Sequence, residues 1–213
     1  VIAAGLRLGG KPGKALDAAY ADLRVAATDA YPAEGDANRT MLDDILEAGL
    51  TPTVETDYQR WQPLHWPIEL PDVFARGGFD AVVGNPPFLG GKKITGAMGS
   101  GMRDWLVNQL AGGTTGNADL VAYFFLRVFS LLSSQGTVGL IATNTVAQGD
   151  TREVGLDQLV AAGFTISGFG MGLAVASTSL ATKTPSSPIL PTLSGSPAGG
   201  CTGSQTMIGL SMI

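Results

Sequence analysis

The fold of this chain is decided by one stretch, Phe79-Asp80-Ala81-Val82-Val83-Gly84-Asn85-Pro86-Pro87-Phe88. Residues 79–83 form an apolar run of the strand type, which predicts a buried strand. The two prolines then exclude both a helix and a continued central strand. The strand must therefore stop at Gly84 and present Asn85 and Phe88 on a stiff loop. In open α/β sheets, ligands bind at the carboxyl ends of the strands, where such a loop lies.

This loop has the residue types that can hold the exocyclic amine of a nucleobase. Such an amine is a poor nucleophile because its lone pair is delocalised into the ring. The Asn85 side-chain oxygen and the Pro86 carbonyl can accept its two N–H bonds and expose the lone pair, which is catalysis by positioning and electrostatics. Phe88 offers a face on which an extruded base can stack, worth about 1–3 kcal/mol per base in single-strand binders. The alternative is a plain strand-ending turn, because Asn and Pro are also common turn residues.

Residues 85–88 resemble the catalytic motif of adenine-N6 DNA methyltransferases, which use S-adenosylmethionine. The flanks sharpen the match, since they are similar to large restriction-modification and phage-defence methyltransferases at residues 64–74, 89–93, 118–125 and 139–152. The resemblance covers roughly residues 58–166. It implies an α/β fold, namely a partial Rossmann-like methyltransferase domain with parallel central strands.

The resemblance also implies a function, the transfer of a methyl group from S-adenosylmethionine to N6 of a flipped adenine in DNA. Asn85 and the Pro86 carbonyl would hold the amine, Pro87 would stiffen the loop, and Phe88 would stack on the adenine. A specificity domain or other subunits of a defence system are expected partners, and the cytoplasm is the expected location.

Lys92 and Lys93 follow the loop within a Gly-Gly-Lys-Lys sequence, which predicts a mobile basic loop beside the base pocket. Their position makes them candidates for clamping a DNA phosphate next to the flipped nucleotide. Two exposed lysines on a glycine loop are as often merely solvated, and the sequence weighs the two interpretations evenly.

Two other functions stay open. RNA and protein amide methyltransferases share the Asn-Pro-Pro core, although the flanks favour a DNA enzyme. The chain could also be an inactive fragment that binds no cofactor. Glycine-rich residues 5–13 do not fit a nucleotide-binding loop, because no convincing strand precedes them and Pro12 interrupts them. We expect the glycine loop for S-adenosylmethionine to lie upstream of Val1, which leaves the cofactor-binding residues unknown.

Composition limits the remaining possibilities. The 213 residues suffice for one good-sized domain, and 45% hydrophobic with 15% charged residues indicates a globular chain. A net charge of −5 argues against tight DNA binding by this chain alone. A single cysteine and a single histidine, His65, argue against an internal disulfide and against a metal site. We expect His65 to be a hydrogen-bonded packing residue. No apolar run of about 18 residues predicts a membrane span.

The chain divides into three parts by composition. Residues 1–57 read as a helical lead-in or insert, with helices at 14–27 and 39–48, and residues 58–166 as the catalytic part. Residues 167–213 hold one charged residue, Lys183, and much Ser, Thr, Gly and Pro, which predicts a low-complexity tail that is disordered or frame-shifted.

Within the catalytic part, the pattern predicts an extended segment over residues 58–74 that packs on the sheet edge. A buried helix should connect the strand at residues 79–83 to a second, parallel strand. Thr143, Asn144 and Thr145 would then share a rim with Asn85, either lining the pocket or merely finishing the strand. The further elements expected are helices at 102–110, 119–132 and 154–162, the second strand at 137–142, and another strand from Phe164.

Overall fold

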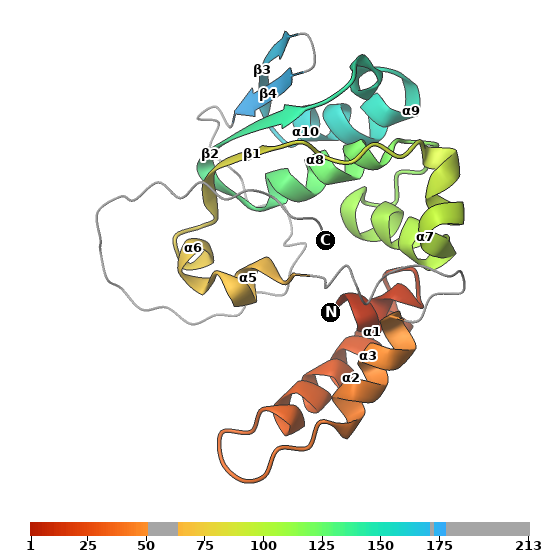
Figure 1. Cartoon of the computed structure of the whole chain (residues 1–213), viewed down its shortest axis with the longest axis vertical. Coiled ribbons are helices and arrows are strands. Elements are labelled where there is room, and N and C mark those ends of the chain that lie inside the picture. Colours follow the sequence, from red (N-terminus) through yellow and green to blue (C-terminus); the bar gives the residue numbers. More distant parts are fainter. Residues whose placement is uncertain (51–63, 171–172, 178–213) are drawn as a thin grey trace.

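The computed structural model describes residues 1–50, 64–170 and 173–177. The N-terminal part is helical, as the sequence predicts, with α1 (Ile2–Leu6), α2 (Lys14–Ala30) and α3 (Thr40–Leu50). α2 and α3 form a hairpin that projects away from the rest of the chain (Figure 1). The sheet and the remaining helices form the body, in which the Asn85 loop lies.

The described sheet has four strands in the order β1-β2-β4-β3. β1 (Phe79–Gly84) runs parallel to β2 (Leu132–Ile141), with Val82 opposite Val138. The helix between them is α8 (Leu120–Ser130), so the predicted parallel strand-helix-strand unit is confirmed. β2 begins earlier than predicted, because Phe79 already pairs with Leu132. The register then shifts, so that Ala81 pairs with Thr137. These features give the mixed α/β fold that the sequence predicts.

Two further strands correct the prediction for the start of the tail. β3 (Thr165–Gly170) begins close to the predicted position, and β4 (Leu173–Ser177) returns antiparallel to both β3 and β2. The sequence analysis assigned residues 167–177 to a low-complexity tail because they carry no charge. An uncharged, mostly apolar run such as LAVAS at 173–177 is equally typical of a strand inside a sheet. Residues 178–213 lie outside the described part.

A second correction concerns the segment before β1. Residues 64–74 are not extended but form α5 (Trp66–Glu69) and α6 (Pro71–Ala75). The prolines of these helices lie in their first turns, where an N–H has no helical partner and its loss costs little. The predicted packing on the sheet is nevertheless present: the rings of Trp66 and Phe74 make edge contacts with Phe79, at 5.5 and 5.6 Å between centroids. Residues 58–63 lie outside the described part.

The prediction of a mobile loop at residues 90–93 is also wrong. Gly90 precedes the first turn of α7 (Gly91–Trp105), so Lys92 and Lys93 are helical. A Cβ at position 91 would lie 2.3 Å from the backbone of Asn117, so this glycine permits a close approach of two backbones rather than motion. α7 is interrupted at Gly99, which has a φ of 83°, and leads into a π-helical turn, η1 (Leu106–Leu110).

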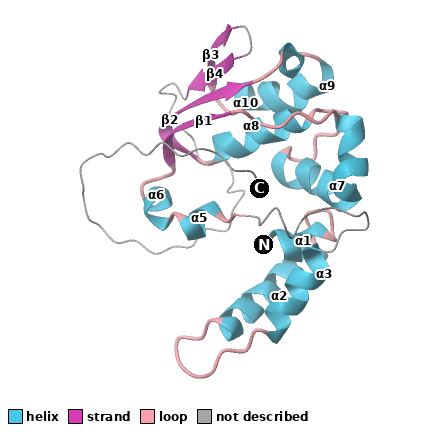
Figure 2. Ribbon diagram, in the orientation of Figure 1, coloured by secondary structure: helices cyan, strands magenta, loops and turns pink. Residues whose placement is uncertain are grey.

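The core is built around α8, which has apolar contacts on two sides. One side packs on the sheet through Phe125 and Val128 against Val138 and Leu140. The other side, including Tyr123, packs against α7. Figure 2 shows α8 running below β1 and β2, with α7 at the end of the sheet where β1 stops. The C-terminal helical segment consists of α9 (Gly149–Arg152), η3 (Glu153–Asp157) and α10 (Gln158–Ala161).

The sheet has one covered and one open face, and neighbouring residues of β2 test this directly. Leu140 is fully buried, whereas Ile141 is 49% exposed. We predict that Leu140→Ala lowers the free energy of unfolding by about 2–5 kcal/mol through the lost burial and the cavity. Ile141→Ala should cost less than about 1 kcal/mol. Chemical denaturation of both variants measures the difference, and equal losses would contradict this placement of the core.

Candidate functional site

The Asn85 loop lies at the carboxyl end of β1, where the sequence predicts it. Asn85 is exposed, Pro86 is buried, and Phe88 is 42% exposed. The loop therefore presents an amide and an aromatic ring to solvent on either side of a proline that is packed into the body.

Both ends of the loop are held by the body. At its start, Gly84 pairs with Leu140 of β2. At its end, the Leu89 N–H donates to Oδ1 of Asp119 at 3.1 Å, and the Leu89 carbonyl accepts from the Leu120 N–H at 3.0 Å. Residues 85–88 thus span two fixed points, one in the sheet and one at the start of α8.

Asp119 connects three segments. Its Oδ1 also accepts from the Val121 N–H at 3.0 Å, which caps the N-terminus of α8. Its own N–H donates to Oγ1 of Thr151, a buried residue of α9, at 3.1 Å. The sequence analysis placed Asp119 only at the start of a helix and did not assign it to the site. An acidic residue directly before an apolar helix predicts a helix cap. This pattern does not predict that the same carboxylate also accepts from the Leu89 N–H.

A polar rim lies beside the loop. Thr143, Asn144 and Thr145 follow β2 and are exposed, and the Thr143 and Thr145 hydroxyl oxygens are 2.6 Å apart. Asn144 begins a short 3-10 helix, η2 (Asn144–Ala147). Because β1 and β2 are parallel neighbours, their carboxyl ends meet at one edge of the sheet, as the sequence predicts for these residues.

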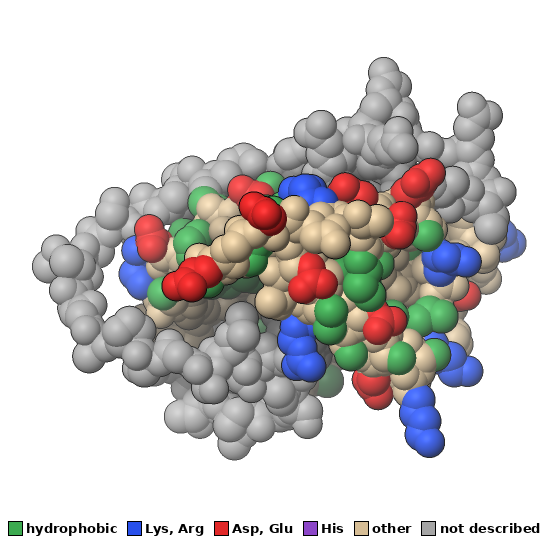
Figure 3. Space-filling view, turned by 90° about the horizontal axis from the view of Figure 1, so that it is seen from below, with side chains coloured by type: hydrophobic (Ala, Val, Ile, Leu, Met, Phe, Trp, Pro, Cys, Tyr) green, Lys and Arg blue, Asp and Glu red, His purple; other side chains and the backbone are tan. Residues whose placement is uncertain are grey.

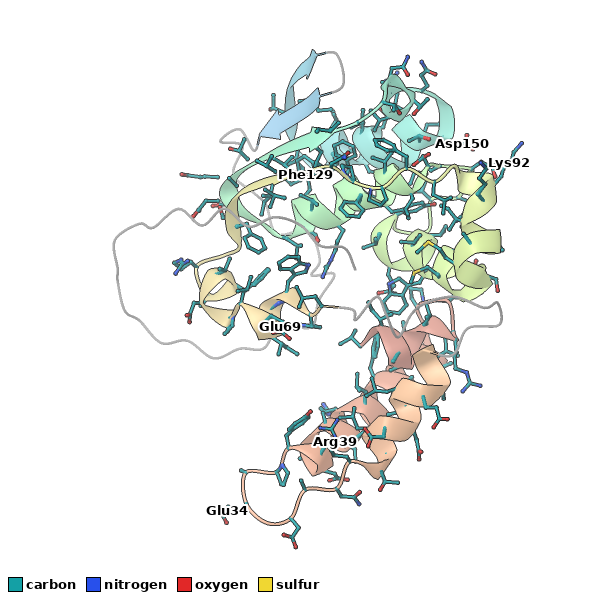
Figure 4. The ribbon with its side chains drawn as sticks, viewed as in Figure 1. Glu34, Arg39, Glu69, Lys92, Phe129 and Asp150 are labelled. Carbon is teal, nitrogen blue, oxygen red and sulfur yellow. The ribbon has the colours of Figure 1, made fainter. Side chains whose placement is uncertain are left out.

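Lys92 and Lys93 lie in the first turn of α7, shortly after the loop, and both are exposed. Figure 4 labels Lys92 and Asp150 at the same end of the molecule. Asn117 lies between these regions: Gly91 packs closely against its backbone, and the Asn117 N–H donates a hydrogen bond to Oδ2 of Asp150 at 2.5 Å. Among the described residues, no carboxylate forms an ion pair with either lysine.

The acidic charge of the chain lies mainly on the projecting hairpin. Residues 14–50 carry eight Asp and Glu against three Lys and Arg, a net charge of −5, which equals the net charge of the whole chain. Figure 3 looks at the end of the molecule that bears the hairpin and shows acidic side chains spread over it. The other residues are neutral on balance, so the acidic net charge does not describe the surroundings of the Asn85 loop.

The glycine-rich stretch 5–13 is a packing element. It follows α1 rather than a strand, and its Gly9 and Gly10 carbonyls accept hydrogen bonds from the Asn108 and Gln109 side chains, at 2.8 and 2.5 Å. A Cβ on either glycine would lie 2.6 Å from a side chain of α7 or η1. The stretch therefore has no free backbone cradle for a nucleotide. Within the described ranges, no cluster of His, Cys, Asp or Glu could hold a metal ion.

Comparison with protein families decides the assignment. The model of the Eco57I restriction-modification methylase family matches residues 14–161. The chain belongs to this family. The match confirms the resemblance to restriction-modification DNA methyltransferases, and it includes the Asn85 loop, α8 and the rim. It begins at the hairpin, well before residue 58, where the resemblance seen in the sequence starts. A comparison with curated proteins finds no match.

Within this methylase fold, His65 lies far from the Asn85 loop along β1. It precedes α5, whose Trp66 packs on Phe79 at the start of the strand, whereas Asn85 follows the end of the strand. Burial, with smaller contributions from the N-terminal charge and Arg127, lowers the pKa of His65. Among the described residues, its buried Nδ1 has no hydrogen-bond partner. His65 is partly buried, as a packing residue should be. Of the described helices, none is long and apolar enough to cross a bilayer.

Proposed function

We propose that this chain is part of an adenine-N6 DNA methyltransferase that serves restriction-modification or phage defence. The observation that carries the proposal is the exposed Asn85, held on a rigid loop at the carboxyl end of β1 in a chain of the methylase family. S-adenosylmethionine is the proposed methyl donor, and the cytoplasm the proposed location. A specificity domain or other subunits would supply recognition of the DNA sequence.

The chemistry assigned to the loop is the positioning of the target amine. The Asn85 oxygen and the Pro86 carbonyl would accept the two N–H bonds of adenine N6. These acceptors localise the lone pair on nitrogen, and they stabilise the positive charge that develops when the nitrogen forms its new bond. Pro86 is buried and Pro87 adjoins it, so the acceptors do not need to reorganise during the reaction.

Phe88 would bind the ring of the target base. A base inside a duplex cannot reach the loop, so the adenine must be flipped out of the stack. The Phe88 ring is 42% exposed and offers part of one face for stacking. Such contacts contribute about 1–3 kcal/mol per base and do not discriminate among bases, so they position the adenine without selecting it.

The glycine-rich candidate among the described residues does not fit a binding site for S-adenosylmethionine. The glycine-rich stretch 5–13 is occupied by hydrogen bonds and side chains of α7 and η1. We therefore assign no residue of the described part to the donor, and the roles given to Asn85, Pro86, Pro87 and Phe88 concern the target base alone.

Asn85→Ala tests the central assignment in the full-length protein. We predict that methyl transfer to DNA falls by at least about 100-fold, comparable to removing a group that stabilises transition-state charge. Thermal unfolding should be unchanged because Asn85 is exposed. Transfer of a radiolabelled methyl group to DNA measures the effect.

The matched control is Asn38→Ala. Asn38 lies between α2 and α3, and its Oδ1 accepts a hydrogen bond from the Thr40 N–H at 3.1 Å. This variant should retain transfer. An Asn85→Ala protein with activity within a few-fold of the wild type would refute the assignment.

Lys92 and Lys93 are proposed to contact DNA phosphates. We predict that Lys92→Gln and Lys93→Gln each weaken DNA binding for all sequences alike and reduce the salt dependence of affinity by about one phosphate contact. Lys14→Gln, which removes an exposed lysine at the start of α2, is the matched control and should leave both quantities unchanged. Fluorescence anisotropy over a range of salt concentrations measures them, and equal effects at all three positions would contradict the contact.

A further inference from the structure

We infer that Asp119 is a positioning residue for methyl transfer, and that its carboxylate sets the conformation of the loop that carries Asn85. The inference rests on the proposed function and adds a residue to it. Asp119 does not touch the target base in this account. It acts through the backbone of Leu89, the residue that follows Phe88.

The loop ends at Leu89, whose backbone is held at both of its polar groups. The Leu89 N–H donates to the Asp119 carboxylate, while the Leu89 carbonyl accepts from the Leu120 N–H. Both polar groups of one peptide residue are therefore bound to the first turn of a single helix. Leu89 is also partly buried against the apolar cluster between α7 and α8. These contacts fix the position and the direction in which the chain leaves the loop.

The span between the two fixed points of the loop is short. Gly84 is held in the sheet by Leu140, and only residues 85–88 separate it from Leu89. Two of these four residues are prolines, whose φ is fixed by the ring. With both ends held, few backbone rotations remain for Asn85 and Phe88. Release of the Leu89 end would restore this freedom.

The position of Asp119 is itself fixed by hydrogen bonds. Its N–H donates to Oγ1 of Thr151, which is 8% exposed, and its Oδ1 caps α8 through Val121. A single carboxylate oxygen thus receives two N–H groups, one from the helix and one from the loop. The loop is therefore aligned with α8, which is fixed between the sheet and α7.

Three substitutions in the full-length protein separate helix capping from loop positioning. Asp119→Asn keeps an oxygen at the same place and can accept both N–H groups. Asp119→Ser keeps a helix cap, since Ser is a good N-cap residue, but its side chain is too short to hold Leu89 as well. Asp119→Ala removes both acceptors. Asp157→Ser, at an exposed residue of η3 that pairs with Arg152, is the matched control.

We expect kcat for DNA methylation to fall by about 10- to 100-fold in Asp119→Ser and Asp119→Ala, the range known for small misplacements of reacting groups. Affinity for DNA should change less than about threefold, because the exposed groups that meet DNA are still present. Asp119→Asn should restore kcat to within a few-fold, and Asp157→Ser should match the wild type. Hydrogen exchange of the Leu89 amide should become faster in the Ser and Ala variants alone.

The inference is overturned if Asp119→Ser has a wild-type kcat, or if its Leu89 amide exchanges no faster than in the wild type. It is also overturned if the Asn variant is as inactive as the Ala variant, because the charge would then matter and not the bond to Leu89. A wild-type protein that transfers no methyl group to DNA refutes the proposed function instead. In that case the exchange of the Leu89 amide still shows whether Asp119 holds the loop.

Discussion

Burial of α8 between the sheet and α7 is the constraint on which the rest of the body depends. Eight of its eleven residues are buried, including Tyr123, Phe124 and Phe125, so the helix cannot be exposed on either of these two sides. It covers one face of the β1-β2 pair and supports the parallel pairing of these strands. The N-terminus of α8 is thereby fixed at the edge where β1 ends, and Asp119 and Leu120 bind the Asn85 loop from there.

The distribution of charge is compatible with this arrangement. A net charge of −5 on a chain that belongs to a DNA-methylase family looks contradictory until the charge is located. It is concentrated in residues 14–50, on a hairpin that projects from the body, whereas Lys92 and Lys93 are exposed beside the loop. Repulsion between exposed charges is largely screened beyond about 10 Å at moderate salt. The acidic net charge of the chain is therefore compatible with its membership of this family.

The sequence predicts what is local and misses what depends on distant contacts. The end of β1 is predictable because Pro86 and Pro87 act on their own backbone, whatever surrounds them. The bond from Leu89 to Asp119 joins residues 30 positions apart, and no local pattern specifies it. The prediction for Gly91 is wrong for the same reason. The glycine-rich composition predicts a mobile loop, but in the structure Gly91 lies against the backbone of Asn117. The strand β4 is missed because a run without charges is compatible with both a tail and a sheet.

The central claim is that this loop holds the exocyclic amine of adenine in DNA. Its most direct test is mass spectrometry of the nucleosides from DNA that the full-length protein has methylated in the presence of S-adenosylmethionine. We predict N6-methyldeoxyadenosine as the methylated product. Methylation of cytosine instead, or methylation of RNA or protein with unmodified DNA, would contradict it.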